Sequence, residues 1–238
     1  MIEEKDYSKI DSLLQVMARL RNPDGGCPWD LEQDFRSIAP FTLEEAYEVV
    51  DAIDRDDMAH LEDELGDLLL QVVFHAQMAK EAGEFEFGHV VAGIVAKMIR
   101  RHPHVFADEV HETPGDVLTR WDEIKAAEKA ARGDAGGSSP LDDIPANLPG
   151  LMQAQKLQKK AHKNGMPQAG ADETLGQLGE LLKTDQWQGD ASSEMVGDLL
   201  FACVNLARQF DVDADAALRE ANQRFRDQYS AETGHADT

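Results

Sequence analysis

The chain of 238 residues contains little cysteine, little positive charge and no long apolar run. Its two cysteines, Cys27 and Cys203, lie far apart in the sequence, so no disulfide framework is predicted and a reducing compartment is expected. The formal net charge of −23 argues against binding of long nucleic acid, because a polyanion is bound by a basic surface. No apolar stretch approaches the roughly 20 residues that span a bilayer, so no membrane partner is expected.

The amino terminus is acidic and lacks the apolar segment of a signal peptide, which favours a cytoplasmic location. Hydrophobic residues make up 42% of the chain and charged residues 29%, as is typical of a soluble globular protein. No alternating strand pattern is evident, whereas apolar residues recur three and four positions apart. The sequence therefore predicts an all-α fold built from helical bundles.

Helix patterns and turn residues divide the first half of the chain. Gly83 is placed to end the third helix, and Pro103 the fourth. Residues 22–30 are rich in turn formers and are expected to form a loop that contains Trp29. The helices are expected at about residues 10–20, 42–54, 57–82, 90–99 and 116–131.

Two acidic clusters lie on the second and third of these helices. Glu45 and Glu48 are three residues apart and share a helix face, as do Glu64 and Asp67. If the two faces turn toward each other, four carboxylates meet, and a hard cation with oxygen ligands keeps all of them ionised. The sequence therefore predicts a divalent metal site, with Mg²⁺ or Mn²⁺ favoured over Zn²⁺, which prefers nitrogen and sulfur donors.

Glu45 also has a purely structural interpretation. Residues 42–45 fit a capping box in which Thr42 caps the helix and Glu45 reaches back to its amide. The second cluster favours the metal, because Glu64 and Asp67 interrupt a strongly apolar helix and carboxylates at the margin of an apolar stripe need a partner.

The chain is expected to contain two similar domains. Residues 133–140, rich in Gly and Ser and closed by Pro140, are the best candidate linker. Beyond them the pattern of residues 65–73 returns at residues 196–204, which suggests duplication of a helical unit. The expected boundaries are a first domain at 1–131, a linker at 132–148, a second domain at 149–230 and a polar tail at 231–238.

The second copy has lost most of the acidic pattern. Met195 stands three positions before Asp198, and Glu194 is displaced by one residue, about 100° around the helix. The stretch that matches the first acidic cluster, residues 176–180, keeps one acid, Glu180. We therefore expect the first domain to carry the chemistry and the second to be structural or a partner in assembly.

These motifs together resemble the MazG-type nucleoside triphosphate pyrophosphohydrolases. The resemblance covers nearly the whole chain and rests on GGCPWD at residues 25–30, the acidic motifs at 44–48 and 64–67, RRHPHVF at 100–106 and WDEIK at 121–125. It implies an all-α pyrophosphatase fold, Mg²⁺ dependence, oligomerisation and hydrolysis of nucleoside triphosphates to monophosphate and pyrophosphate. Relatives suggest sanitation of the nucleotide pool as the cellular role.

The resemblance also implies roles for individual acids. Glu45, Glu48, Glu64 and Asp67 are the expected metal ligands, and Glu44 is a further ligand or a neighbour of the ligands. A carboxylate that is not coordinated accepts the proton of the attacking water. Glu44 and Glu48 both remain candidates for this base.

A basic helix face offers contacts to phosphate. Lys97, Arg100 and Arg101 share one helix face in an acidic chain, and lysine and arginine side chains bind phosphate oxygens well. The alternative is that these side chains are simply solvated on the surface. Trp29 could stack on a nucleobase or pack half-buried. Lys125 is a secondary phosphate candidate.

The alternative function is a non-enzymatic helical protein, either a nucleotide-binding regulator or an assembly scaffold. Under either function we expect a homodimer or higher oligomer, because apolar residues such as Leu199, Phe201 and Val204 need cover from a partner or from their own bundle.

Overall fold

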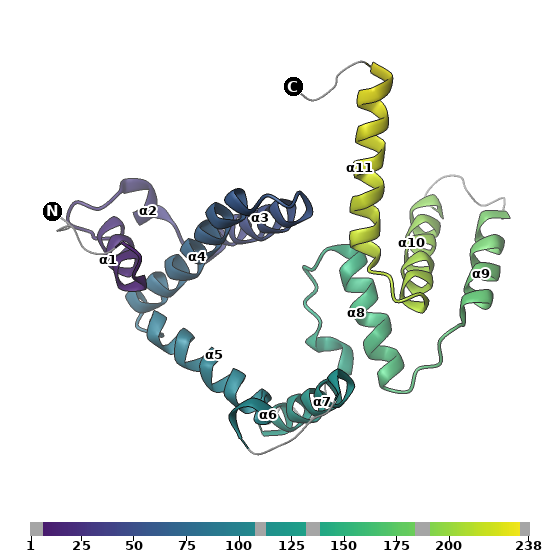
Figure 1. Ribbon diagram of the computed structural model, residues 1–238, viewed down its shortest axis with the longest axis horizontal. Helices are drawn as coiled ribbons and strands as arrows, with labels where there is room; N and C mark the ends of the chain where they lie inside the picture. The colour runs from purple at the N-terminus through teal and green to yellow at the C-terminus, as the bar shows by residue number, and fades with distance from the viewer. Residues whose placement is uncertain (1–6, 108–112, 132–138, 184–190, 234–238) are drawn as a thin grey trace. The chain divides into compact units, whose positions relative to one another are not determined.

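The computed structural model describes residues 7–107, 113–131, 139–183 and 191–233. Within these ranges all regular structure is helical and no strand is present, which confirms the all-α fold (Figure 1). None of the helices in these ranges combines the length and the apolar character needed to cross a bilayer.

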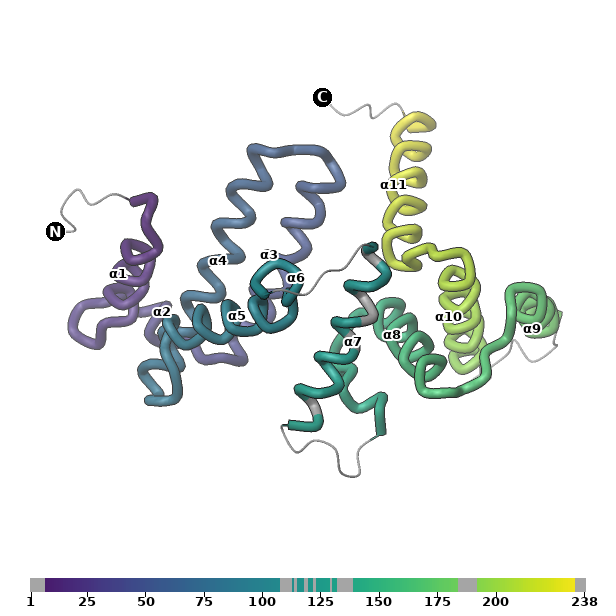
Figure 2. Tube along the Cα trace, turned by 60° about the horizontal axis from the view of Figure 1, so that its bottom comes forward, coloured from purple at the N-terminus to yellow at the C-terminus, as the bar shows by residue number. Residues whose placement is uncertain are grey.

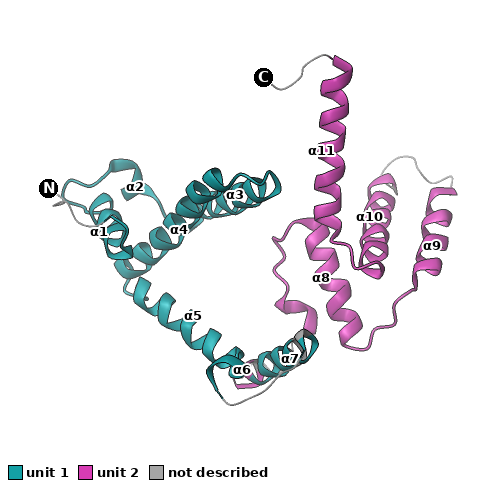
Figure 3. Cartoon of the chain, in the orientation of Figure 1, with its two compact units in different colours: residues 1–127 teal, residues 128–238 magenta. Residues whose placement is uncertain are grey.

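The chain forms two compact units, residues 1–127 and 128–238 (Figure 3). The division falls inside α7, near the expected end of the first domain at residue 131. Of the expected linker, residues 132–138 lie outside the described ranges, and η1 (Pro140–Asp143) lies in the remainder. The last helix runs into the expected polar tail, ending at Thr233.

The helices of the first unit agree with four of the five expected there. Residues 10–20, 58–81, 90–99 and 116–131 are helical, so α4 is one residue shorter at each end than expected, and Gly83 follows its cap with a positive φ of 74°. The bounds are α1 (Ile10–Leu20), α2 (Pro28–Glu32), α3 (Phe35–Asp54), α4 (Met58–Glu81), α5 (Phe87–Arg101), α6 (Pro103–Phe106) and α7 (Pro114–Ala131).

The start of α3 differs from the expectation. The helix begins at Phe35 because Asp34 caps it: the Asp34 carboxylate accepts hydrogen bonds from the amides of Arg36 and Ser37, and the Ser37 hydroxyl accepts one from the Asp34 amide. Thr42 lies inside the helix, where its Oγ1 contacts the Nε2 of His75 at 3.1 Å. The capping box proposed for residues 42–45 is therefore wrong.

A small apolar core joins α1, α3 and α4. Met17 from α1, Ile38 from α3 and Val73, Phe74 and Met78 from α4 form one buried cluster. This core lies toward the N-terminal end of α3 and the C-terminal half of α4, so the opposite ends of both helices remain free to carry polar side chains.

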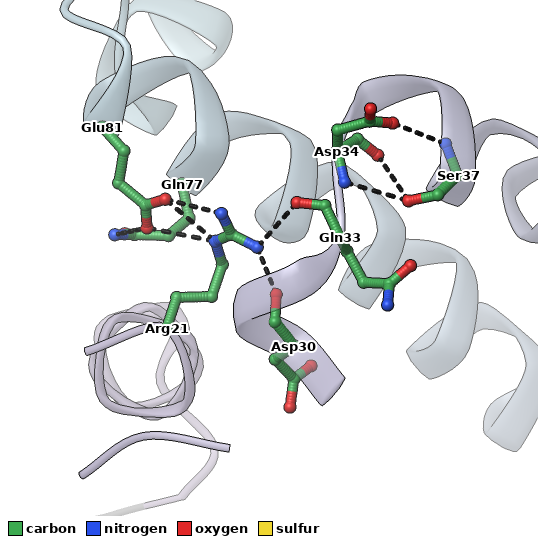
Figure 4. A network of polar contacts seen from close by, with 7 residues as sticks. All are labelled: Arg21, Asp30, Gln33, Asp34, Ser37, Gln77 and Glu81. Atoms are coloured by element: carbon green, nitrogen blue, oxygen red, sulfur yellow. Dashed lines mark hydrogen bonds and ion pairs between the residues drawn. The ribbon is translucent and has the colours of Figure 1, made fainter. Parts of the chain in front are cut away.

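A polar network fixes the turn-rich segment against α4 (Figure 4). The Arg21 guanidinium pairs with the Glu81 carboxylate, with 2.7 Å between Nη2 and Oε2, and donates hydrogen bonds to the backbone carbonyls of Asp30 and Gln33. Burial raises the pKa of Glu81, but hydrogen bonds from Arg21 and Gln77 and the charge of Arg21 outweigh it and lower the pKa overall. The network joins α1, α2 and α4.

The second unit repeats this arrangement. α10 (Ala191–Gln209) packs against α8 (Gly150–Lys163) and α9 (Ala171–Lys183), as α4 packs against α1 and α3, and α11 (Ala214–Thr233) follows (Figure 2). The Asn205 amide donates to the Thr174 hydroxyl at 3.0 Å, a contact that parallels the pair formed by Thr42 and His75. The same helix order and contacts support duplication.

Candidate functional site

The acidic cluster lies between α3 and α4, which form an antiparallel pair. A tight turn joins them, in which Asp56 adopts a positive φ of 54° and the Asp57 carboxylate caps α4 by accepting a hydrogen bond from the amide of His60. The end of α3 is thereby brought beside the start of α4, so acids separated by about twenty residues in sequence can meet.

Three of the four predicted metal ligands converge. One carboxylate oxygen from each of Glu45, Glu48 and Glu64 lies within 4.8 Å of the other two. Glu64 is buried, Glu45 is half-buried and Glu48 is exposed. In the described part of the chain this is the one such group of three acidic, histidine or cysteine residues.

The electrostatics of the cluster follow from its burial and crowding. Burial raises the pKa of Glu45, and the charges of Asp67, Glu48 and Glu64 raise it further. Burial also raises the pKa of Glu64; the charges of Glu48 and Asp67 act in the same direction, and His60 acts against them. Without a cation, the folded chain therefore resists full ionisation of its own site.

Asp67 and Glu44 lie at the edge of this cluster. Asp67 is exposed on α4, one helical turn after Glu64, and its charge acts on both Glu45 and Glu64. Glu44 is exposed on α3 and shares a helix face with Glu48. Neither belongs to the converging three, and because both are exposed, a ligand or a water molecule can reach them.

Two partners of the carboxylates did not emerge from the sequence. His60 Nε2 lies 3.0 Å from Glu64 Oε1. The amide of Gln71, buried on α4, donates to Glu45 Oε1 at 3.4 Å, while its own Oε1 has no hydrogen-bond partner. The spacing of four residues between His60 and Glu64 was visible in the sequence, but the contact of Gln71 depends on how α3 and α4 pack.

The donor set suits a hard divalent cation. Three carboxylates supply oxygen ligands only, which Mg²⁺ and Mn²⁺ accept and which Zn²⁺ disfavours. Burial is the first cause of the raised pKa values of Glu45 and Glu64, neighbouring carboxylates raise them further, and a cation would favour the ionised forms. The residues present therefore fit such an ion.

Trp29 lies in α2, not in the expected loop. It is 52% exposed, and its ring meets that of Phe41 edge to face, with 6.2 Å between centroids. Phe41 lies one helical turn before Glu45 on α3, so the indole stands near the face that carries the carboxylates. This geometry is consistent with both interpretations of Trp29, stacking on a base and packing.

The predicted phosphate-binding cations lie on other helices. Lys97, Arg100 and Arg101 are on the last two turns of α5. Lys125 on α7 lies over the ring of Trp121, 5.7 Å from its centroid, and Trp121 in turn contacts His102, the residue after Arg101, with 5.0 Å between centroids.

This contact places Lys125 beside the end of the basic helix. Trp121 and His102 were not predicted as site residues, although both lie in the sequence motifs at 100–106 and 121–125. Their ring contact joins the residue that follows α5 to α7, and an aromatic face flanked by cations is suited to a nucleotide.

Comparison with known proteins finds a matching domain family and several relatives of this chain. Residues 33–106, which contain the acidic cluster and the basic end of α5, match the MazG nucleotide pyrophosphohydrolase domain. The nucleoside triphosphate pyrophosphohydrolase of Escherichia coli strain K12 is 48% identical over 225 residues, which cover 92% of this chain and 84% of the relative. The nucleoside triphosphate pyrophosphohydrolase/pyrophosphatase MazG of Thermotoga maritima is 38% identical over 222 residues, with the same coverage.

Among solved structures, a mazG-related protein from Thermotoga maritima is 26% identical with a TM-score of 0.43, and the match covers 49% of this chain and 99% of that one. The relatives from Escherichia coli and Thermotoga maritima extend along both units, and the matched domain contains all four predicted metal ligands. The chain belongs to the MazG family of nucleotide pyrophosphohydrolases.

Proposed function

We propose that the protein hydrolyses nucleoside triphosphates to nucleoside monophosphates and pyrophosphate, with Mg²⁺ as the metal and Mn²⁺ as a possible substitute. The observation that carries this proposal is the convergence of Glu45, Glu48 and Glu64 to within 4.8 Å. The names of the relatives from Escherichia coli and Thermotoga maritima support the reaction.

Each carboxylate has a distinct part in this proposal. Glu45, Glu48 and Glu64 hold the ion, and Asp67 adds a fourth negative charge beside them. Mg²⁺, when bound, supplies positive charge that orients phosphate oxygens and lowers the pKa of a water molecule. His60 and Gln71 keep the oxygens of Glu64 and Glu45 in place.

Proton transfer falls to an acid on the exposed side of α3. Glu44 and Glu48 are both exposed and share one helix face, so each can meet a water molecule that attacks the triphosphate. The Glu48 carboxylate converges with those of Glu45 and Glu64, whereas Glu44 lies outside the converging group. This division favours Glu44 as the base and Glu48 as a ligand.

The nucleotide itself is bound by residues outside the cluster. The basic residues Lys97, Arg100, Arg101 and Lys125 are suited to phosphate oxygens. Trp29, half-exposed near Phe41, offers a ring on which a base can stack.

A product assay tests the proposal. Ordinary and chemically damaged nucleoside triphosphates are incubated with the full chain and Mg²⁺. Released orthophosphate is then measured with and without added inorganic pyrophosphatase, which converts pyrophosphate to orthophosphate. We expect orthophosphate only when pyrophosphatase is present, and no product when the metal is chelated. Orthophosphate released without pyrophosphatase, or no turnover of any nucleotide, would contradict the proposal and favour a non-enzymatic regulator or scaffold.

The proposed cellular role is sanitation of the nucleotide pool in the cytoplasm. A sanitation enzyme should discriminate in favour of damaged or surplus nucleotides, and discrimination is a ratio of kcat/KM values. Comparison of these values across the same panel tests the role separately from the chemistry.

We also propose that the chain forms a homodimer or a higher oligomer. Apolar residues on α5, including Val91, Ile94 and Val95, are between 40% and 49% exposed, and Phe201 on α10 is 48% exposed, whereas Val204 is buried in its own unit. Apolar surface of this extent is typical of an interface. Light scattering at micromolar concentration should give at least twice the mass of 26.3 kDa.

A further inference from the structure

Two carboxylates of the acidic cluster each have one oxygen engaged by an N–H from another side chain. The amide of Gln71 donates to Glu45 Oε1 at 3.4 Å. His60 Nε2 lies 3.0 Å from Glu64 Oε1 and is the donor of that pair, because an ionised carboxylate only accepts. Both donors lie on α4, and both carboxylates belong to the converging three. Side chains that are not ligands themselves therefore influence how these two ligands present their oxygens.

Gln71 carries a buried oxygen that the rest of the described chain does not satisfy. The residue is only 7% exposed, and its Oε1 has no hydrogen-bond partner there. Turning the amide over would bring this oxygen against the Glu45 carboxylate, where two acceptors would repel each other. A buried acceptor without a partner is unfavourable, so packing alone would favour an apolar side chain at this position. What the amide contributes is the N–H that it offers to Glu45.

The second unit lacks these donors as well as the acids. In the helical repeat, Ala202 of α10 stands at the position of Gln71, and Ala191 stands at the position of His60. Neither alanine has a side chain that can donate a hydrogen bond. The two donors thus occur in the unit that has the converging carboxylates, and the shared packing of the helices does not require them.

The engaged oxygens affect which ion suits the cluster. An oxygen that already accepts from an N–H is a poorer metal ligand, so Glu45 and Glu64 each offer an ion one favourable oxygen. Mg²⁺ demands near-ideal octahedral geometry, keeps several water ligands and takes few ligands from carboxylates. Ca²⁺ accepts more oxygens in a flexible geometry and readily binds both oxygens of one carboxylate. Carboxylates that are limited to one oxygen therefore favour Mg²⁺.

We propose that Gln71 and His60 are positioning residues that make the acidic cluster selective for Mg²⁺ over Ca²⁺. This inference rests on the proposed function, since it concerns the ion held by the same site, but it does not depend on which nucleotide is cleaved. Each donor holds one oxygen of its carboxylate away from the ion. When a donor is removed, its carboxylate can turn and offer both oxygens, which Ca²⁺ uses better than Mg²⁺ does.

Calorimetric titration of the full chain with MgCl₂ and, separately, with CaCl₂ tests this proposal, at constant ionic strength and without nucleotide. Gln71→Met keeps a flexible side chain of similar length and removes the N–H. We expect the dissociation constant for Mg²⁺ to rise by about tenfold, the scale associated with a lost partner of a metal ligand, and that for Ca²⁺ to change by less than about threefold. The ratio of the two constants should therefore move toward Ca²⁺.

Gln77→Met is the matched control. Gln77 lies on the same helix, and its amide donates to the Glu81 carboxylate at 2.8 Å, so its loss should leave both dissociation constants within about twofold of wild type. His60→Ala changes a side chain that is 41% exposed and should move the ratio in the same direction as Gln71→Met. Because Gln71 Oε1 has no partner, Gln71→Met should melt within about 3 °C of wild type when neither ion is present. A purely structural role for Gln71 predicts a lower melting temperature and an unchanged ratio.

The outcomes distinguish this inference from the proposed hydrolysis. The inference is overturned if Gln71→Met and His60→Ala change both constants by the same factor, if both variants bind like wild type, or if the wild-type chain binds neither ion. A Gln71→Met chain that does not fold overturns the part assigned to Gln71, and His60→Ala then decides the part assigned to His60. If the ratio moves as expected but no nucleotide is cleaved with Mg²⁺, the inference stands and the proposed hydrolysis fails. If nucleotides are cleaved and the ratio does not move, the hydrolysis stands and the two donors have no part in selecting the ion.

Discussion

The three converging carboxylates differ in exposure, and this difference sets what each can do. Glu64 is 7% exposed and is held by His60, whereas Glu48 faces solvent while still reaching Glu45 and Glu64. Burial and neighbouring negative charge raise the pKa of the buried Glu64 and of the half-buried Glu45. Glu48 is therefore the most accessible of the three acids to a ligand from solvent, and its carboxylate also lies close to those of Glu45 and Glu64.

Substitution of Glu48 should show whether activity depends on the acidic cluster or on exposed acids in general. Glu48→Gln keeps the shape of the side chain but removes a charged ligand, so turnover of nucleoside triphosphates with Mg²⁺ should fall by at least about 100-fold. Glu62→Gln, which removes an exposed carboxylate on α4 outside the cluster, should stay within about twofold of wild type. Equal activity of the two variants would mean that the cluster has no part in the mechanism.

The residue pattern predicted the acids of the site better than their partners. Spacing of three on an amphipathic helix is readable in one dimension, which is why Glu45 was paired with Glu48 and Glu64 with Asp67. The structure brings Glu45, Glu48 and Glu64 together and leaves Asp67 at the edge of the cluster. Gln71 contacts Glu45 across two helices, and that contact depends on the register between α3 and α4, which no local pattern encodes.

The Arg21–Glu81 pair should make stability depend on pH. The pKa of Glu81 is lowered in the folded chain from an ordinary value of 4.5, so its stabilisation is fully present above that value and is lost as pH falls through the lowered pKa. Glu81→Gln should therefore cost roughly 1 kcal/mol near neutral pH, because Arg21 is buried and keeps a neutral acceptor only.

Urea unfolding of wild type and Glu81→Gln, measured near pH 7 and near pH 3, checks this sign. The difference in free energy of unfolding should shrink at the lower pH, because stabilisation by a lowered pKa declines once the pH falls below the ordinary value of 4.5. A difference that is constant or grows on acidification would mean that the charge of Glu81 does not stabilise the fold.

At the scale of elements, the caps decided where the helices begin. Pro40 and the threonine-acid pattern at residues 42–45 both favour a start after Pro40, yet α3 starts at Phe35 and accommodates Pro40 in its second turn. The Asp34–Ser37 capping box satisfies the first amides, and the buried Ile38 packs in the core. Apolar burial and a good cap together outweighed the proline, which a local pattern could not foresee.

The turn between α1 and α2 requires glycine at residue 26. A Cβ added to Gly26 would lie 2.3 Å from the backbone oxygen of Leu20 and 2.6 Å from that of Asn22, both fixed by hydrogen bonds. Gly26→Ala should therefore lower the free energy of unfolding by about 1–3 kcal/mol, the cost of overpacking.

Gly93→Ala on α5 is the matched control. A Cβ there meets nothing within 4 Å, so alanine should stabilise the helix by about 0.5–1 kcal/mol. Thermal unfolding of both variants measures the two opposite shifts. If Gly26→Ala melts like wild type, the turn is not held as closely as its geometry indicates.

At the scale of the whole molecule, one helical plan occurs twice with different side chains. Each unit packs one long helix against two others and joins a threonine to a polar partner across them. The first unit turns three carboxylates toward one point; in the described part of the second unit no such group exists, and an apolar cavity with dispersed acids lies there instead. The two units thus share a packing plan and differ in the side chains that this plan brings together.

Paired substitutions in the two units test this division of labour. Glu180→Gln and Asp198→Asn remove the acids of the second unit that correspond most nearly to the cluster, and they should leave the Mg²⁺-dependent rate within a few-fold of wild type. Asp67→Asn in the first unit, next to the converging carboxylates, should reduce the rate by about 100-fold. Circular dichroism confirms that each variant is folded before rates are compared. If the second-unit variants lose turnover while Asp67→Asn is tolerated, the active site belongs to the second copy, and the converging acids of α3 and α4 serve only the structure of the first.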